Sequence, residues 1–171
     1  VIGAHTLWEE YPPKIAEDEI KTVAETGEIV LSRVVIPETI VVHDGAPSDP
    51  TAIDYYVPYK DYIKNVASNE IYSTWPDASL RANILAIRLI FLIKNTLLAI
   101  MSFTLNRVYT EWYRNKGYDF TITSSTAYDQ KWIYNKTIYK NISRIVDEQF
   151  ANYLSRPGVT QPIFTQYCDG K

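Results

Sequence analysis

One glutamate in this sequence lies where its carboxyl group is suited to proton transfer. Glu70 follows the apolar pair Val66-Ala67 of an expected helix and precedes Ile71-Tyr72, with Trp75 in the turn beyond. A carboxyl group against aromatic and aliphatic surface loses solvation, which raises its pKa toward the range in which it donates a proton. A solvated glutamate on a helix surface fits the same composition. The sequence therefore leaves two interpretations of Glu70: a general acid/base and a surface charge.

The sequence patterns of metal sites and of other catalytic machinery are missing. The two histidines, His5 and His43, are far apart, and no HExxH pattern includes either of them. Cys168 is the single cysteine, so neither a CxxC pair nor a disulfide within the chain is possible. Walker, GxGxxG and GxSxG patterns do not occur. The sequence predicts no metal and no cofactor, and His43 is interpreted as a satisfied strand-end histidine or a surface histidine rather than a catalytic one.

The composition is that of an ordinary globular domain with an excess of tyrosine. Hydrophobic residues make up 46% and charged residues 22% of the 171 positions, and there are 14 Tyr against 5 Phe. Tyrosine joins a flat apolar face to a hydroxyl, which suits glycan or partner grooves as well as half-buried surface. Residues 1–50 carry ten acidic and three basic side chains, and the rest carries fourteen Lys and Arg against ten Asp and Glu. No segment is basic enough to predict a nucleic-acid partner.

The apolar patterning predicts an α+β fold in which central helices pack with short strands from both ends of the chain. The expected helices cover about residues 58–71, 78–93, 96–115 and 138–154, with a short acidic one at Ala16–Glu25. The expected strands are Glu28–Ile36, Thr39–His43, Tyr118–Thr123 and Pro162–Cys168. Turn residues at Asp44–Thr51 make this segment the best boundary between an acidic N-terminal extension, residues 1–50, and a domain covering residues 51–171.

The apolar run Ile84–Leu105 raises the question of a membrane span. Arg88 and Lys94 interrupt it, and a charge near the middle of a bilayer costs about 2.5–3.5 kcal/mol. Buried helices are therefore the preferred interpretation, and no membrane span is expected. One straight helix from about residue 78 to Tyr113 would be about 54 Å long. Because this length exceeds what a small domain accommodates, we expect a break near Lys94–Thr96.

Eleven residues between Tyr62 and Arg88 occur in the same order and spacing as the residues of a motif found in other proteins. They are Tyr62, Val66, Ala67, Glu70, Leu80, Arg81, Ala82, Asn83, Leu85, Ala86 and Arg88. In this register the stretch resembles the SpoIID/LytB family of bacterial peptidoglycan-cleaving proteins, whose segment contains Val-(Ala)-Ser/Ala-Glu-Met-Pro and then Ala-Leu-Lys-Ala-Gln-Ala-x-Ala-Ala-Arg. Two later segments, Gln130–Tyr134 and Ile163–Gly170, resemble the family's Gln-x-Tyr and Ser-Gly-Gly strands. The chain has Ile71-Tyr72 in place of Met-Pro, and the family's C-terminal Gly-His-Gly-like motif has no counterpart before Lys171.

The resemblance implies lytic cleavage of glycan strands by a single glutamate. In such enzymes the glutamate protonates the glycosidic oxygen and then, as a carboxylate, helps the 6-hydroxyl of the sugar to close a 1,6-anhydro ring. On this interpretation Glu70 is the acid/base, and Arg88 binds substrate or positions Glu70. Tyr72, Trp75 and Gln130 are the other expected substrate-binding residues. If Arg88–Ile100 is an insertion, the family's arginine position falls on Met101 instead.

The expected partners are peptidoglycan glycan strands and other envelope or sporulation proteins. The expected location is the bacterial cell envelope, either extracytoplasmic or spore-associated. A second interpretation is a non-catalytic module that binds peptidoglycan or takes part in envelope or spore assembly. The substitution of Ile71-Tyr72 for Met-Pro and the missing C-terminal motif favour this module, whereas the register of Glu70 favours the enzyme.

Overall fold

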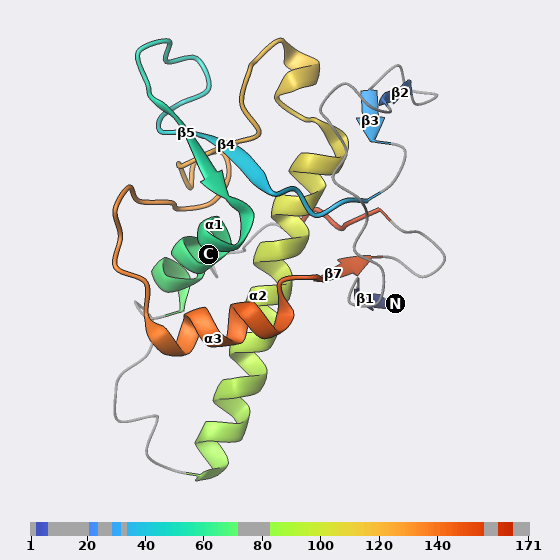
Figure 1. Ribbon diagram of the computed structural model, residues 1–171. Coiled ribbons are helices and arrows are strands. Elements are labelled where there is room, and N and C mark those ends of the chain that lie inside the picture. The colour runs from blue at the N-terminus through green and yellow to red at the C-terminus, as the bar shows by residue number, and fades with distance from the viewer. Residues whose placement is uncertain are drawn as a thin grey trace.

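The computed structural model describes most of the chain from residue 34 onward and three short strands before it. The described backbone covers residues 3–6, 21–23, 29–31, 34–71, 83–155 and 161–165, and the described side chains cover residues 34–71, 91–155 and 161–165. Three helices and seven short strands are present in these ranges, which confirms the predicted α+β class. The strands flank the central helices (Figure 1).

A three-stranded sheet lies beside the helices, with its strands in the order β5-β4-β6. β4 (Thr39–His43) confirms the predicted strand, and it pairs in antiparallel fashion with β5 (Asp54–Pro58) along its whole length. β6 (Ile122–Thr123) pairs with the other edge of β4 in parallel, and it is shorter than the predicted Tyr118–Thr123. The turn-rich segment after His43 is therefore the loop of a β4–β5 hairpin. Strands of this one sheet lie on both sides of residue 50, where the sequence predicted a boundary.

The remaining strands form two separate pairs. β1 (Gly3–Thr6) pairs in antiparallel fashion with β7 (Asn152–Ser155), and β2 (Lys21–Val23) pairs with β3 (Ile29–Leu31). The predicted helix at Ala16–Glu25 is wrong at residues 21–23, because the β-branched Thr22 and Val23 pair with β3 there.

The chain passes from the sheet into α1 (Tyr59–Glu70) without a loop. Pro58 ends β5 with extended backbone angles and precedes the first helical residue, a place where its missing N–H costs no hydrogen bond. Asp61 in the first turn complements the positive end of the helix dipole. Tyr62, Ile63 and Val66 are fully buried, so the helical spacing predicted for this stretch is the spacing of its packed face.

α2 (Asn83–Thr110) is one continuous helix of 28 residues, so the predicted break near Lys94–Thr96 is wrong. No glycine or proline occurs between Pro76 and Gly117, and nothing in that run therefore forces an interruption. Of the α2 side chains that the structure describes, Phe91 and Leu92 are exposed, and Ile93 is the first that is buried. Figure 1 shows the N-terminal end of α2 reaching past α1 and α3. Along the described ranges no helix has both the length and the apolar character that crossing a bilayer requires.

The C-terminal part of the chain holds α3 (Lys140–Gln149) and then returns as β7. The predicted helix at residues 138–154 is thus too long at its end. Tyr153 and Ser155 are buried while Asn152 and Leu154 are half-buried, and this alternation of two suits a strand paired with β1. Beyond β7, Pro162 forms a single bridge with Ser155, and residues 163–165 form no strand; the rest of the predicted strand Pro162–Cys168 lies outside the described residues.

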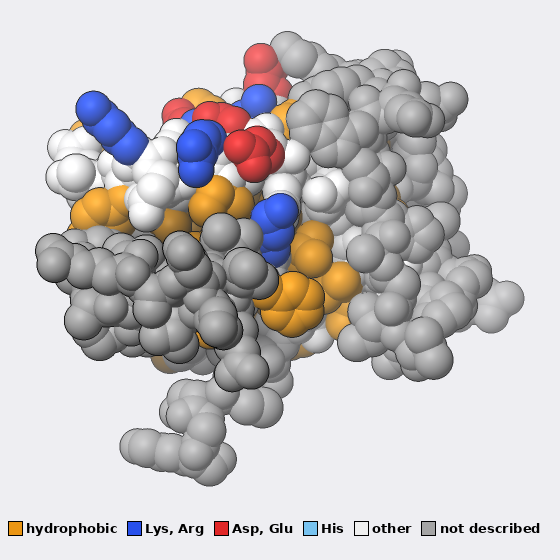
Figure 2. Space-filling model, turned by 90° about the horizontal axis from the view of Figure 1, so that it is seen from below, with side chains coloured by type: hydrophobic (Ala, Val, Ile, Leu, Met, Phe, Trp, Pro, Cys, Tyr) orange, Lys and Arg blue, Asp and Glu red, His pale blue; other side chains and the backbone are white. Residues whose placement is uncertain are grey.

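A single large core joins the sheet, the helices and β7. Its fully buried side chains include Ile40, Val42, Tyr59, Tyr62, Ile63, Val66, Leu97, Ile100, Met101, Leu105, Ile122 and Ile142. A smaller cluster on the other face of β4 contains Val41, Tyr113 and Phe120. Figure 2 shows one outer face, on which lysine and arginine side chains are interspersed with acidic ones and border apolar residues. The described part of this face therefore shows no purely basic patch.

Candidate functional site

Glu70 is the last residue of α1, where the helix leaves the core. Its side chain is half-buried, and this burial raises its pKa above the ordinary value of 4.5. The positive charge of Lys131 opposes the effect and lowers the pKa of Glu70. The structure therefore places a partly desolvated carboxyl group near an ammonium group, and the carboxyl group stays protonated to a higher pH than a fully solvated one.

Lys131 belongs to a connector, residues 124–139, that runs between β6 and α3 without regular secondary structure of its own. Two asparagines of α1 bind its backbone. The carboxamide of Asn65 accepts a hydrogen bond from Ile133 N (3.1 Å) and donates one to Ile133 O (2.8 Å). Asn69 Nδ2 donates to Lys131 O (3.0 Å) and lies 3.1 Å from Asn65 Oδ1. The two side chains give the connector backbone the hydrogen-bond partners that a neighbouring strand would otherwise supply. They thereby fix Lys131 beside the end of α1.

These two asparagines were not among the site residues predicted from the sequence, although their spacing is a signal. Asn65 and Asn69 are four residues apart and therefore lie on one face of the helix. Both are buried, with 6% and 9% exposure. Buried carboxamides need hydrogen-bond partners, so a polar pair on an otherwise apolar helix face indicates a bound backbone segment.

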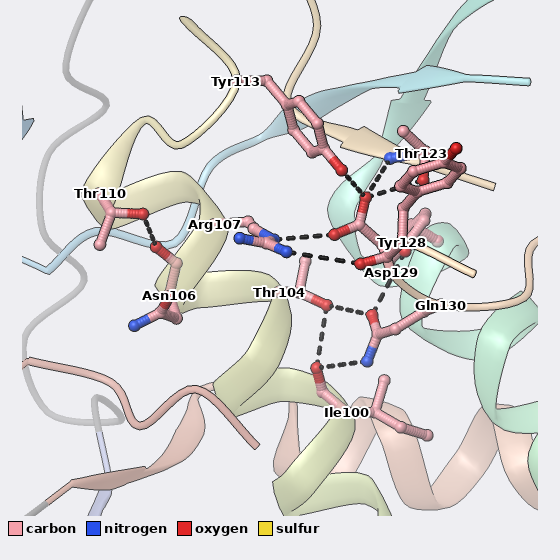
Figure 3. Close-up of polar contacts among 11 residues, drawn as sticks. Ile100, Thr104, Asn106, Arg107, Thr110, Tyr113, Thr123, Tyr128, Asp129 and Gln130 are labelled. Carbon is pink, nitrogen blue, oxygen red and sulfur yellow. Dashed lines mark hydrogen bonds and ion pairs between the residues drawn. The ribbon is translucent and has the colours of Figure 1, made fainter. Parts of the chain in front are cut away.

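Gln130, one of the expected substrate-binding residues, is 2% exposed and lies among α1, α2 and the connector. Its Oε1 accepts a hydrogen bond from the hydroxyl of Thr104 (2.9 Å), and its Nε2 donates to Ile100 O (3.2 Å) (Figure 3). The same Oε1 accepts a hydrogen bond from the hydroxyl of Tyr62 at 3.3 Å. These contacts anchor the connector to both helices. Substrate binding by Gln130 stays a prediction.

The structure does not describe the other expected substrate-binding side chains. Tyr72 and Trp75 lie outside the described residues. Arg88 lies on the described backbone of α2, but its side chain is outside the described set. Met101, the alternative to Arg88 in the family register, is fully buried in the main core. Of the expected site residues, Glu70 and Gln130 are thus the two whose side chains have a described environment.

A buried charged cluster fixes the start of the connector (Figure 3). Asp129 has no exposed side-chain surface, and its Oδ1 accepts a hydrogen bond from Arg107 Nε at 2.8 Å. Its Oδ2 accepts from the Tyr113 hydroxyl (2.6 Å), from Thr123 N (2.9 Å) and from Thr123 Oγ1 (2.8 Å). We call these four residues the Asp129 cluster. Burial, and next the hydrogen bond to Asp129, raise the pKa of Tyr113, so its hydroxyl stays protonated and remains a donor.

Arg107 is also enclosed by aromatic rings. Its guanidinium carbon lies 4.7–5.5 Å from the ring centres of Phe103, Trp112, Tyr113 and Phe164. Each distance is within the range of a cation–π contact. The aromatic enclosure and the carboxylate together compensate for burying the charge, and they join α2 to the connector and to residues 161–165.

Three aromatic rings gather where β5 meets the connector. Tyr55 stacks on Tyr134 with ring centres 4.6 Å apart and planes 23° apart. Trp132 backs the pair, 5.3 Å from Tyr55 and 6.2 Å from Tyr134. Trp132 is 6% exposed, whereas Tyr134 is 54% exposed. We call Tyr55 and Tyr134, backed by Trp132, the tyrosine platform.

His43 has the geometry of a structural histidine. Its Nδ1 lies 2.6 Å from Asp54 Oδ1, and its Nε2 lies 3.0 Å from Ala46 O. Its ring stacks on Phe120 at 4.3 Å. These contacts tie the hairpin loop to the ends of β4 and β5. Among the described residues, no three His, Cys, Asp or Glu side chains come together as a metal site would require.

No family model, no curated protein and no solved structure matches this chain. The likeness to the SpoIID/LytB family therefore rests on the sequence motifs alone.

Proposed function

We propose that the protein cleaves peptidoglycan glycan strands as a lytic transglycosylase, with Glu70 as its single acid/base. The observation that carries the proposal is the partly desolvated carboxyl group of Glu70, whose pKa is raised by burial. A raised pKa keeps a larger share of the carboxyl groups protonated near neutral pH, as the first step of the reaction requires. The family register of Tyr62–Arg88 supports the same residue.

The proposed reaction needs one carboxyl group and no water. Protonated Glu70 donates its proton to the glycosidic oxygen as the bond from C1 of the sugar to that oxygen breaks. The Glu70 carboxylate then takes the proton of the 6-hydroxyl of the same sugar while that oxygen bonds to C1. The products are a strand with a 1,6-anhydro end and a strand with a free hydroxyl, and Glu70 ends in its protonated form. This differs from hydrolysis, in which a second carboxylate commonly activates water or forms a covalent intermediate.

The positive charge of Lys131 affects the two proton transfers of Glu70 in opposite directions. Its ammonium group favours the ionised form of Glu70, so it opposes the first proton transfer and assists the second. The two hydrogen-bonded asparagines hold the Lys131 backbone, and hence the root of its side chain, in place relative to α1. The balance between burial and Lys131 therefore sets the fraction of Glu70 that is protonated.

Glu70→Gln tests the proposal directly. Incubation of the wild-type protein with denuded glycan strands is expected to produce 1,6-anhydro ends that mass spectrometry detects. Glu70→Gln is expected to lower the rate at least about 100-fold, the usual contribution of a positioned general acid/base. Glu148→Gln, a change of an exposed glutamate on α3, is the matched control and should keep the wild-type rate.

The main alternative is a non-catalytic module that binds peptidoglycan. It predicts strand binding without anhydro ends in the wild-type protein, and equal binding by Glu70→Gln. Anhydro ends that persist in Glu70→Gln would show that another group performs the chemistry, and they would overturn the role of Glu70.

A further inference from the structure

The tyrosine platform offers a rigid aromatic surface to solvent. Tyr55 is held by β5, Tyr134 by the connector, and Trp132 is fixed in the main core behind them. The exposed part of Tyr134, 54% of its surface, belongs to a ring that its neighbours already hold in place. A ligand that packs on this ring therefore meets a surface that loses little side-chain freedom on binding.

The segment that carries the platform is also positively charged. Residues 131–140 contain Lys131, Lys136 and Lys140 and no acidic residue, although the whole chain has a net charge of −3. The acidic residue next to the platform on β5, Asp54, is bound to His43 at 2.6 Å. A ligand at the platform thus meets ring faces and hydroxyl groups on a segment whose charged side chains are all lysines, and the Lys136 ammonium group lies 5.9 Å from the ring centre of Tyr139.

These groups match the chemistry of an acidic sugar. The C–H faces of a sugar ring pack on an aromatic face, and its hydroxyls pair with tyrosine hydroxyls. A carboxylate on the sugar pairs with a lysine ammonium group. Muramic acid residues in a glycan strand without stem peptides carry such a carboxylate.

We propose that Tyr55 and Tyr134, together with Lys131 and Lys136, form a subsite for an acidic sugar residue of a glycan strand. The proposal rests on the proposed function, because the ligand is the same strand that Glu70 would cleave. Asn65 and Asn69 tie the connector to α1, so one framework carries both the subsite and Glu70.

Single-stranded nucleic acid is the other polymer that binds aromatic and basic surfaces, and the geometry favours it less. Proteins that bind such strands stack bases on aromatic rings and often contact phosphates through arginine. Tyr55 and Tyr134 already stack on each other, so no base can enter between them. The connector contains no arginine, the side chain best shaped for two-pronged phosphate contacts.

The test measures binding of denuded glycan strands to protein that carries Glu70→Gln, so that cleavage does not consume the ligand. In this background Tyr134→Ala is expected to weaken binding about tenfold. Tyr56→Ala is the matched control, because Tyr56 is the next residue on β5, faces the other side of the strand and is 76% exposed. It should change the affinity less than about twofold. Equal effects of the two variants would overturn the subsite.

The contribution of the Lys131 and Lys136 charges to strand binding is tested separately. Lys131→Gln with Lys136→Gln is expected to weaken binding about three- to tenfold and to reduce its dependence on salt. Lys94→Gln, a change of an exposed lysine on α2, should have no effect. Neutral N-acetylglucosamine oligomers of equal length should bind more weakly than the acidic strands. Equal binding of the neutral oligomers, or tighter binding of a single-stranded oligonucleotide, would contradict the proposal.

The two proposals fail in different ways. If the wild-type protein produces no anhydro ends but Tyr134→Ala still weakens binding, the catalytic proposal is wrong and the subsite stands. If anhydro ends form but Tyr134→Ala binds like Tyr56→Ala, the subsite is wrong and the role of Glu70 stands. Circular dichroism of each variant confirms that it is folded before its affinity is compared.

Discussion

Single residues decide the chemistry proposed for this protein, and Glu70 shows how finely the surroundings of one group are balanced. Burial raises its pKa, and Lys131 lowers it. The apolar neighbours of Glu70 in the sequence favoured the first effect. The second was not visible, because Lys131 is 61 positions away and reaches Glu70 only through the path of the connector. The sequence predicted the identity of the candidate acid, whereas its electrostatic neighbour needed the fold.

Lys131→Gln is expected to raise the pKa of Glu70, because it removes the charge that favours the ionised carboxylate. NMR titration of the Glu70 carboxyl carbon measures this shift without relying on activity. In cleavage assays the loss of rate on the alkaline side should move to higher pH, since Glu70 then stays protonated longer. Lys94→Gln is the control, and a titration curve unchanged by Lys131→Gln would show that the two groups do not interact.

The raised pKa of Glu70 also makes the stability of the folded protein depend on pH. The folded protein binds a proton at Glu70 at higher pH than the unfolded chain, so the contribution of Glu70 to stability is full below about pH 4.5 and falls as the pH rises through the folded-state pKa. Glu70→Gln removes this loss of stability at higher pH, because glutamine does not titrate. Its melting temperature should therefore equal or exceed that of the wild-type protein at neutral pH, and the difference should shrink in acid. This is the pattern expected of a group kept for function.

Asn65→Ala is expected to destabilise the protein by about 1–3 kcal/mol, because it leaves the N–H and C=O groups of Ile133 without their partner. Urea unfolding measures the loss. Asn95→Ala, a change of an exposed asparagine on α2, should stay within about 0.5 kcal/mol of the wild-type value. Equal losses in the two variants would mean that the connector does not depend on Asn65.

The elements show where sequence patterns suffice and where they fail. The apolar spacing in α1 and the β-branched residues of β4 predicted both elements close to their observed bounds. The end of the predicted helix at residues 138–154 failed because Tyr153 and Leu154 satisfy helical spacing and strand alternation alike, and only the partner strand β1 decides between them. The break predicted in α2 is wrong because domain size does not limit a helix whose N-terminal end reaches past its neighbours (Figure 1).

Leu97 and Leu92 both lie on α2 but differ in burial, so they test how much each side chain adds to stability. Leu97 is fully buried and Leu92 is 50% exposed. Leu97→Ala is expected to cost about 2–5 kcal/mol through lost burial and a cavity. Leu92→Ala should cost less than about 0.5 kcal/mol. Denaturant unfolding compares them, and a similar cost for the two changes would place Leu92 in the core.

At the scale of the whole molecule, the Asp129 cluster joins parts of the chain that no local pattern connects. Arg107 and Tyr113 come from the end of α2 and the turn after it, Thr123 comes from β6, and Asp129 comes from the connector. The cluster therefore fixes the sheet and the connector against α2 at one point. No pattern in the sequence predicted this cluster, since charged residues at these spacings are normally solvated.

Asp129→Ala is expected to cost about 3–5 kcal/mol, because it leaves the Arg107 guanidinium buried without its carboxylate. Asp147→Ala is the control, since Asp147 is 48% exposed and pairs with Lys64 at the surface. That change should cost less than about 1 kcal/mol. The double change Arg107→Met with Asp129→Leu should recover part of the stability lost by Asp129→Ala. A single variant as stable as the wild-type protein would show that Arg107 is compensated by the rings alone.

The parallel pairing of β4 with β6 has a consequence for how the chain folds. β5 follows β4 within a short hairpin and can pair with it as soon as both are made, whereas β6 is almost eighty residues further along. Until β6 arrives, one edge of β4, with the apolar residues Ile40, Val41 and Val42, has no partner from this sheet. Closing such a distant contact is slow, and an open apolar edge can recruit strands from other chains. During synthesis, the delay between these two strands is thus a stage at which this edge of β4 is open to strands from other chains.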